Sequence, residues 1–139
     1  MLRICLYVSG NAATGSRWVA KCAHPNYKDR WVVRRWPLID RVATKPADRE
    51  VMAVANALHY YENTYPLDKP AELLVLSPVC IPLVVVSQPD LWRWVRYLQN
   101  TEAEFKAAGT QINYGQLTDL KELEARVATE PHDSCRFEV

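Results

Sequence analysis

Glu50 is the carboxylate with the most clearly defined position in this sequence, at the start of a stretch with a helical pattern. Apolar residues recur there at helical spacing, at Val51, Val54, Ala55, Leu58 and Tyr61. Glu50 therefore lies in the first turn of a predicted amphipathic helix, on the edge of its apolar stripe. A carboxylate suits the positive end of a helix and points toward whatever the helix packs against. Two interpretations stay open: a surface acid favoured by the helix dipole, and an acid that acts in a site.

A second acid, Glu124, lies on the inner side of a predicted helix near the C-terminus. This helix runs from about residue 119 to 129, and its inward stripe is Leu120, Leu123 and Val127. Glu124 falls inside that stripe. A carboxylate on an inner face costs desolvation energy unless it is paired, faces a cleft or holds a metal. The pattern therefore makes Glu124 a second candidate for a functional acid.

Other common catalytic and cofactor patterns are absent from the sequence. The three histidines are far apart, and there is no Gly-x-Ser-x-Gly motif. The cysteines lack metal-ligand spacing, and Cys5, Cys22 and Cys80 are predicted to be buried free thiols. The chain has four glycines and no glycine-rich phosphate loop, so no cofactor is expected.

Length and composition indicate one intracellular globular domain. The chain has 139 residues, of which 49% are hydrophobic and 24% charged, as is ordinary for such a protein. No apolar run is long enough to span a bilayer, and residues 1–3 lead into a strand pattern without a signal peptide. The net charge of +1 provides no field toward nucleic acid or a membrane. Residues 1–130 are therefore predicted to form a single domain, with a mobile tail at 131–139.

The order of the predicted elements places both acids in an α/β fold. Three strands joined by short turns form a meander, over residues 3–8, 17–23 and 31–36. The Glu50 helix covers residues 48 to about 61 and leads to a strand at 72–76. Because this connection is a crossover, the strand is predicted to be parallel to the first. Another helix begins at residues 87–90, a fifth strand covers 111–117, and the Glu124 helix follows.

The segment between the fourth strand and the next helix is harder to assign. Ser77-Pro78 is typical of an N-cap followed by a first-turn proline. Pro82 argues against a regular helix through residue 86. Residues 79–86 therefore fit a short helix, a strand extension or a loop.

Several segments match the motifs of one superfamily, and the element order matches it too. Glu50-Val51-Met52-Ala53-Val54-Ala55-Asn56-Ala57-Leu58 is similar to a first-helix motif with a Glu, then Leu-Met-Ala, then Ala-Leu. Tyr7-Val8-Ser9-Gly10-Asn11 resembles the end of a first strand that normally reads Thr-Asp-Gly-Ser. Shorter matches are Asp90-Leu91-Trp92, Gln111-Ile112-Asn113-Tyr114 and the helix segment Leu123-Glu124-Ala125-Arg126-Val127-Ala128. The chain resembles the ribonuclease H-like superfamily, which implies a five-stranded mixed sheet, a three-strand meander and two further strands, flanked by helices.

The resemblance also implies a metal site, and this chain departs from the superfamily's pattern there. The superfamily's activity needs acids from the first strand, first helix, fourth strand and last helix, which hold two divalent ions. Glu50 fits the first-helix position, and Glu124 fits the last-helix position, with Glu122 as a register alternative. Ser9 and Ser77 stand at the two strand positions. Because a hydroxyl is a poor substitute for a bridging carboxylate, the metal site is predicted to be lost or badly weakened.

Three functions are compatible with this pattern. The first is a catalytically degenerate ribonuclease H-like domain, a pseudoenzyme that binds nucleic acid or a protein. The second is an active ribonuclease H-type nuclease with an atypical site, which would need Mg²⁺ to cut an RNA–DNA hybrid. The third is an unrelated α/β protein-interaction domain. The two serines at acidic positions favour the first.

Basic residues beside tryptophans make RNA or an RNA–DNA hybrid one candidate partner. The residues concerned lie on the second and third strands: Arg17, Lys21, Arg34 and Arg35, near Trp18, Trp31 and Trp36. Arginine next to aromatic rings suits contacts to phosphates and stacking on bases. The alternative is a solvated sheet face with tryptophans in the core, which the small net charge favours.

Trp92 and Trp94 make the helix that follows residues 87–90 a candidate docking surface. Trp92 fits beside the inward stripe of that helix, whereas Trp94 falls off it and is predicted to be exposed. An exposed tryptophan often marks a protein interface. This helix is therefore predicted to bind a protein partner or a second copy of the chain.

Overall fold

Residues 3–12, 16–36, 46–65, 70–87, 92–130 and 133 are described by the computed structural model, with backbone only at 87 and 92–94. The strands are β1 (Arg3–Asn11), β2 (Arg17–Ala23), β3 (Arg30–Arg35), β4 (Glu72–Ser77) and β5 (Gln111–Gln116). The helices are α2 (Pro46–Thr64), α3 (Ile81–Ser87), α4 (Trp92–Ala107) and α5 (Lys121–Thr129). The predicted element order is therefore confirmed.

The five strands form one mixed sheet in the order β3-β2-β1-β4-β5. β1 pairs antiparallel with β2, and β2 pairs antiparallel with β3, so the predicted meander is confirmed. β4 runs parallel to β1, with Leu6 opposite Val75, and β5 runs parallel to β4. The parallel crossover through α2 predicted from the sequence is therefore also confirmed.

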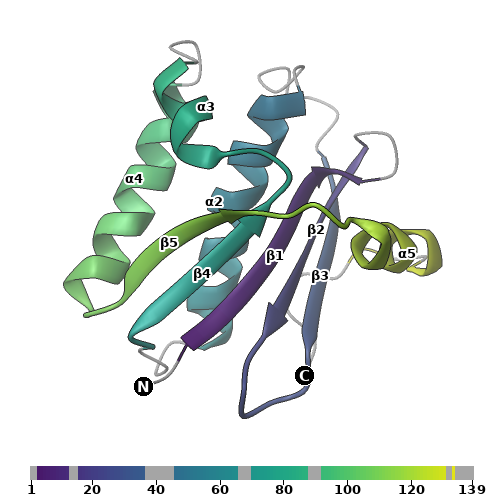
Figure 1. Ribbon diagram of the computed structural model, residues 1–139, viewed down its shortest axis with the longest axis horizontal. Helices are drawn as coiled ribbons and strands as arrows, with labels where there is room; N and C mark the ends of the chain where they lie inside the picture. Colours follow the sequence, from purple (N-terminus) through teal and green to yellow (C-terminus); the bar gives the residue numbers. More distant parts are fainter. Residues whose placement is uncertain are drawn as a thin grey trace.

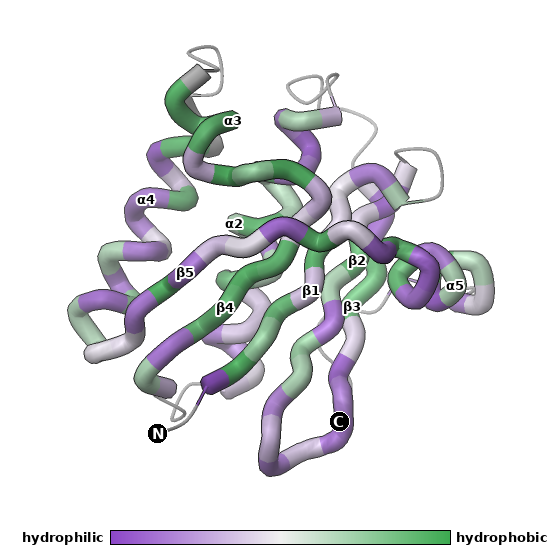
Figure 2. The backbone as a smooth tube through the Cα atoms, in the orientation of Figure 1, coloured by the Kyte–Doolittle hydropathy of each residue, from purple (hydrophilic) through white to green (hydrophobic). Residues whose placement is uncertain are grey.

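One face of the sheet carries the main core, and α2, α3 and α4 cover it (Figure 1). The alternating residues Ile4, Leu6 and Val8 of β1 point to this face and are fully buried. α2 contributes its apolar stripe, including Leu58 and Tyr61. Figure 2 shows the same preference as a hydrophobic run along β1 and β4, at the centre of the sheet.

The opposite face is covered by α5 over the meander. Leu123 and Val127 of α5 are buried against Val19 of β2 and Val33 of β3. β2 is therefore buried on both faces, although its sequence pattern predicts a half-buried strand. α5, the helix that carries Glu124, contacts β1 and β2 (Figure 1).

Two local predictions are wrong, and the segment for which the sequence left three alternatives is resolved. β1 continues through Gly10 to Asn11, whereas the sequence predicts a turn at these residues. Ser77 ends β4 and does not cap a helix, since its hydroxyl donates to the carbonyl of Val79 (2.8 Å). The segment 79–86 resolves into a short helix that begins at Ile81, so Pro82 is the first-turn proline.

The cysteines agree in part with the prediction of buried thiols. Cys22 is buried, Cys5 is half-buried and Cys80 is exposed, and none of the three forms a disulfide within the described residues. Cys80 is exposed because it lies in the short connection between β4 and α3, outside the core. None of the described helices combines the length and apolarity needed to cross a membrane. The predicted mobile tail falls outside the described residues, apart from Asp133.

Candidate functional site

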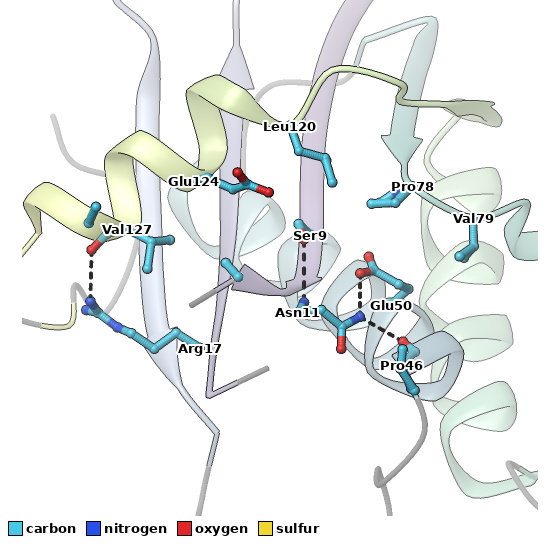
Figure 3. Close-up of a pocket in the computed structure, with 12 residues that line it drawn as sticks. Ser9, Asn11, Arg17, Pro46, Glu50, Pro78, Val79, Leu120, Glu124 and Val127 are labelled. Carbon is cyan, nitrogen blue, oxygen red and sulfur yellow. Dashed lines mark hydrogen bonds between the residues drawn. The ribbon is translucent and has the colours of Figure 1, made fainter. Parts of the chain in front are cut away.

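A cavity of about 630 Å³ is lined by residues of β1, α2 and α5 and by the segment after β4, the elements in which the sequence analysis predicts the four site positions. Ser9 from β1, Glu50 from α2 and Glu124 from α5 all line it (Figure 3). Pro78 and Val79, just after β4, line it as well. Ser77 itself is fully buried and is not part of the lining. The structure therefore brings together the segments that carry all four positions, and it places three of the four side chains at one cavity.

Gly10 allows the end of β1 to lie directly against the first turns of α2. A Cβ atom at Gly10 would lie 2.2 Å from the carbonyl oxygen of Arg49 and 2.9 Å from the backbone nitrogen of Glu50. Real Cβ atoms do not approach backbone atoms so closely, so no other residue fits without moving the strand or the helix. This close approach positions Glu50 beside the end of β1.

Glu50 is buried, with 2% exposure, and both of its carboxylate oxygens accept hydrogen bonds from β1. The backbone N–H of Gly10 donates to Oε2 (3.0 Å), and the side-chain amide of Asn11 donates to Oε1 (2.7 Å). The same Asn11 amide also donates to the carbonyl of Pro46, the first residue of α2 (2.9 Å). Glu50 and Asn11 therefore link β1 to α2 (Figure 3).

Asn11 is a site residue that the sequence analysis missed. It stands in the segment Ser9-Gly10-Asn11, which has the composition of a turn. Its partners Pro46 and Glu50 are 35 and 39 residues away in the sequence, so no local pattern indicates the contact. A second position near Ser9 therefore carries a neutral amide that donates a hydrogen bond to Glu50.

Burial sets the protonation tendency of Glu50. Desolvation raises the pKa of Glu50 above its ordinary value of 4.5, and the hydrogen bonds from Asn11, Gly10 and Ser9 lower it by less. The folded protein therefore holds a proton on this group to higher pH than the unfolded chain does. The free energy of unfolding consequently falls as the pH rises above about 4.5 through the folded-state pKa.

Glu50→Gln is expected to remove this component of the pH dependence, because glutamine does not titrate. The measurement is urea unfolding of the wild type and the variant over a series of pH values that brackets the ordinary value of 4.5. The expected result is that the stability of the wild type declines relative to Glu50→Gln as the pH rises. Glu124→Gln is the matched control, since this acid is exposed, and it should keep the wild-type profile. Parallel profiles for the wild type and Glu50→Gln would contradict the assignment.

Glu124 differs from its sequence prediction. Its side chain is exposed, so it does not sit on a buried inner face of α5, although it does line the cavity. The buried stripe of α5 is narrower, at Leu123 and Val127, because α5 covers only the meander part of the sheet. Glu122, the alternative to Glu124 in the sequence analysis, is not among the described residues that line the cavity. It forms an ion pair with Lys21 instead.

The pair of divalent ions implied by the superfamily resemblance does not fit these residues. The described cavity wall offers two carboxylates, and both oxygens of Glu50 already accept hydrogen bonds. The guanidinium of Arg17 lines the same cavity and adds a positive charge. Two adjacent divalent ions need several carboxylates to offset their mutual repulsion. Within the described ranges, no three acidic, histidine or cysteine side chains come close enough together to bind a metal.

The basic residues predicted to bind nucleic acid do not form one surface. Arg17 and Lys21 lie on the α5 side of β2, whereas Arg34 pairs in register with Trp18 and follows it to the other face. Arg17 donates to the carbonyls of Val127 (3.3 Å) and Glu130 (2.9 Å) and pairs with Asp133 (2.7 Å). These contacts hold the C-terminal end of α5 against β2.

Lys21 and the tryptophans also have structural contacts. Lys21 pairs with Asp29 (3.3 Å) and with Glu122, and its ammonium lies over the ring of Trp31. Trp18 is buried and packs against Trp36 at a centroid distance of 6.3 Å. The alternative of core tryptophans is therefore right for Trp18. Arg35 remains exposed, although its backbone N–H donates to Asp133 (3.0 Å).

Trp92 and Trp94 lie in the first turn of α4, as the backbone shows. Their side chains are outside the described part of the structure, so the predicted docking role of these two residues stays a prediction. The described part of α4 contributes Leu98 and Phe105 to the main core.

Two solved structures share the fold described above. One is RNase H1 from the halophilic archaeon Halobacterium salinarum NRC-1, with a TM-score of 0.55 and 10% identity, covering 91% of this chain and 97% of that one. The other is the N-terminal RNase H domain of a Mycobacterium tuberculosis protein, with a TM-score of 0.54 and 14% identity, covering 92% and 97%. No protein-family profile and no curated protein matches the sequence. The chain has a ribonuclease H-like fold, and at this identity the likeness concerns the fold alone.

Proposed function

We propose that this chain is a non-catalytic ribonuclease H-like domain that acts as a protein-interaction module. The observation that supports this most is the state of Glu50. Its two oxygens are the acceptors of the Gly10 N–H and the Asn11 amide, so the acid serves as a link between β1 and α2. A cation at this carboxylate would have to share its oxygens with these two donors, and Glu124 is the one other acid in the described cavity lining.

The charges around the cavity support the same proposal. Serines stand at the two strand positions, and Glu124 is an isolated exposed acid of the cavity wall. Without bound cations, Glu50 and Glu124 would repel a phosphodiester at this point. Arg17 and Lys21, which could offset that repulsion, are engaged by Asp133 and by Asp29 and Glu122. A protein partner is therefore favoured over nucleic acid.

Binding of RNA or an RNA–DNA hybrid is the second candidate function. The exposed Arg35, with the half-buried Arg34 next to it on β3, is the observation that favours it. These two arginines lie at an edge of the sheet, where a nucleic-acid backbone could reach them. An active nuclease with an atypical site is the remaining alternative, because Glu50 and Glu124 do share one cavity.

A cleavage assay tests the proposal. The full chain is incubated with an RNA–DNA hybrid and Mg²⁺ or Mn²⁺, beside an active ribonuclease H as the positive control. We expect no cleavage above a chelator-treated sample, for the wild type and for Glu50→Gln alike. Metal-dependent cleavage that disappears in Glu50→Gln would overturn the proposal in favour of the nuclease.

The same samples separate the two binding candidates. Hybrid affinity is measured at low and moderate salt. A protein-interaction module should show no binding, or weak binding without dependence on Arg34 and Arg35. Tight binding at low salt that falls steeply with added salt and weakens in Arg34→Ala/Arg35→Ala would establish backbone contacts and favour nucleic acid.

A further inference from the structure

β5 leaves a row of backbone groups open at one edge of the sheet. It is the last strand in the order β3-β2-β1-β4-β5. The N–H of Gln111 donates to the carbonyl of Ala71, and the N–H of Leu117 donates to the carbonyl of Ser77. The backbone N–H and C=O groups of the odd-numbered residues of β5 therefore point toward β4. The N–H and C=O groups of Ile112, Tyr114 and Gln116 therefore point outward. In the ranges that the structure describes, no backbone partner lies beside them.

The two edges of this sheet are protected very differently. β3, at the far edge, carries Arg30, Arg34 and Arg35, and its Arg35 N–H is already bonded to Asp133. Charges and occupied backbone groups are the usual means of preventing unwanted strand pairing. β5 has the sequence Gln-Ile-Asn-Tyr-Gly-Gln, with no charge and no proline. It therefore lacks the protection that the other edge has.

Two cavities flank this edge on the face of the sheet that α2, α3 and α4 cover. A cavity of about 500 Å³ lies between β5 and α4, beside Ile112, with Glu102 and Lys106 in its wall. A cavity of about 270 Å³ lies beside Tyr114, with Glu102 again in its wall. Ile112 and Tyr114 are two residues apart, which is the spacing of side chains on one face of a strand, roughly 7 Å. Alternate side chains of an added strand would therefore meet one cavity each.

The smaller cavity is apolar and open to solvent at its rim. Its apolar lining comes from α3 and α4, with Ile81, Pro82, Val85, Val86 and Leu98. Val86 is 83% exposed, and its neighbour Leu83 is 69% exposed. Large aliphatic side chains that are so exposed next to a cavity are typical of a surface that another chain covers. Figure 2 shows α3 as a predominantly hydrophobic helix.

We propose that the β5 edge and its two flanking cavities bind an extended segment of a partner protein, which adds a sixth strand to the sheet. The segment carries an aliphatic side chain for the smaller cavity. Two positions away it carries a lysine or arginine for Glu102, a residue that lines both cavities. Backbone hydrogen bonds to Ile112, Tyr114 and Gln116 provide the affinity, and the two side chains provide the specificity.

The environment of Glu102 argues for a basic partner residue and against a second copy of this chain. Burial raises the pKa of Glu102, so a nearby cation would stabilise the ionised form. Two β5 strands paired about a two-fold axis near Tyr114 would bring two Glu102 side chains toward that axis. Like charges so placed oppose self-association.

The test uses the full chain and two short acetylated, amidated peptides of threonine, with a central Leu-Thr-Lys or Lys-Thr-Leu. The readout is amide chemical shifts and hydrogen exchange as peptide is added. We expect at least one peptide to shift the amides of Ile112, Tyr114 and Gln116 and to slow their exchange, with submillimolar to millimolar affinity. Replacing the peptide lysine with norleucine should weaken binding about fivefold, as a partly buried ion pair predicts.

Two variants of α4 test whether the peptides bind at the β5 edge and its two flanking cavities. Glu102→Gln should weaken the lysine peptide about fivefold and leave the norleucine peptide unchanged. Glu104→Gln, an exposed acid on the same helix outside both cavities, should bind like the wild type. Either of two results overturns the proposal: no shift at β5 with both peptides at millimolar concentration, or concentration-dependent pairing of β5 with itself in the absence of peptide. This binding site rests on the proposed role as a protein-interaction module. None of these readouts involves hybrid cleavage. A lack of peptide binding would therefore leave the non-catalytic assignment intact, and hybrid cleavage would leave the peptide-binding result intact.

Discussion

Gly10→Ala is expected to lower the free energy of unfolding by about 3 kcal/mol or more. The added methyl group would lie 2.2 Å from the carbonyl oxygen of Arg49 and 2.5 Å from its carbonyl carbon. Both are backbone atoms of α2, so they cannot swing aside as a flexible side chain would. Relief requires β1 and α2 to separate, and this separation would also lengthen the Gly10 and Asn11 hydrogen bonds to Glu50.

The measurement is urea and thermal unfolding of Gly10→Ala beside Gly109→Ala. Gly109 is the control because a Cβ there meets nothing within 4 Å. Its backbone has a positive φ of 91°. Its substitution costs only the left-handed backbone strain, about 1 kcal/mol. Gly10→Ala should therefore melt roughly 10 °C below the wild type and clearly below the control. If the two variants have equal stability, the close approach of β1 and α2 does not exist.

The sequence could predict the elements of this fold because its apolar residues repeat with clear periods. Ile4, Leu6 and Val8 alternate along β1, and Val51, Val54 and Leu58 follow the helical period of α2. Burial of these residues on one face is a consequence of the period itself. The ends of elements were less predictable: β1 runs through Gly10 to Asn11, because Gly10 lies against α2 instead of making a turn.

The positions of the site residues were predictable, but their chemical state was not. Ser9, Glu50 and Glu124 do share one cavity, since strand and helix ends meet at one edge of the sheet. The hydrogen bond between Asn11 and Glu50, by contrast, joins residues 39 positions apart and depends on the exact approach of β1 to α2. The exposure of Glu124 depends on how much of the sheet α5 covers. The period of the apolar residues predicts neither how closely β1 approaches α2 nor how much of the sheet α5 covers.

The basic cluster shows the same limit. Arg17, Lys21 and Arg34 look contiguous along the chain, yet alternation along the strands sends Arg34 to the opposite face from the other two. The partners of Arg17 lie more than a hundred residues away, at Val127, Glu130 and Asp133. An arginine that fastens a distant helix is indistinguishable in sequence from one that contacts a phosphate.

Arg17→Met is therefore expected to lower the free energy of unfolding by about 2 kcal/mol, as is typical when several charge-assisted hydrogen bonds are lost from a partly buried site. The Arg17 side chain is only 12% exposed, and it bonds two carbonyls at the C-terminal end of α5 as well as the Asp133 carboxylate. α5 has two buried side chains, Leu123 and Val127, so its polar contacts with β2, including the Glu122–Lys21 ion pair, are a large part of its attachment. Hydrogen exchange should accordingly speed up in α5 before it does in α2.

Asp133→Asn is the graded control, since it removes the ion pair and keeps the two carbonyl contacts of Arg17, so it should cost less than Arg17→Met. Burial raises the pKa of Asp133, but the hydrogen bonds from Arg17 and from the Arg35 backbone lower it by more, and the net direction is down. The contribution of this ion pair is therefore present above the ordinary value of 3.8 and is lost as the pH falls through the lower, folded-state value. If Arg17→Met leaves stability and exchange in α5 unchanged and instead weakens binding of an RNA–DNA hybrid, Arg17 belongs to a nucleic-acid surface, and the case for a protein-interaction module loses one of its main supports.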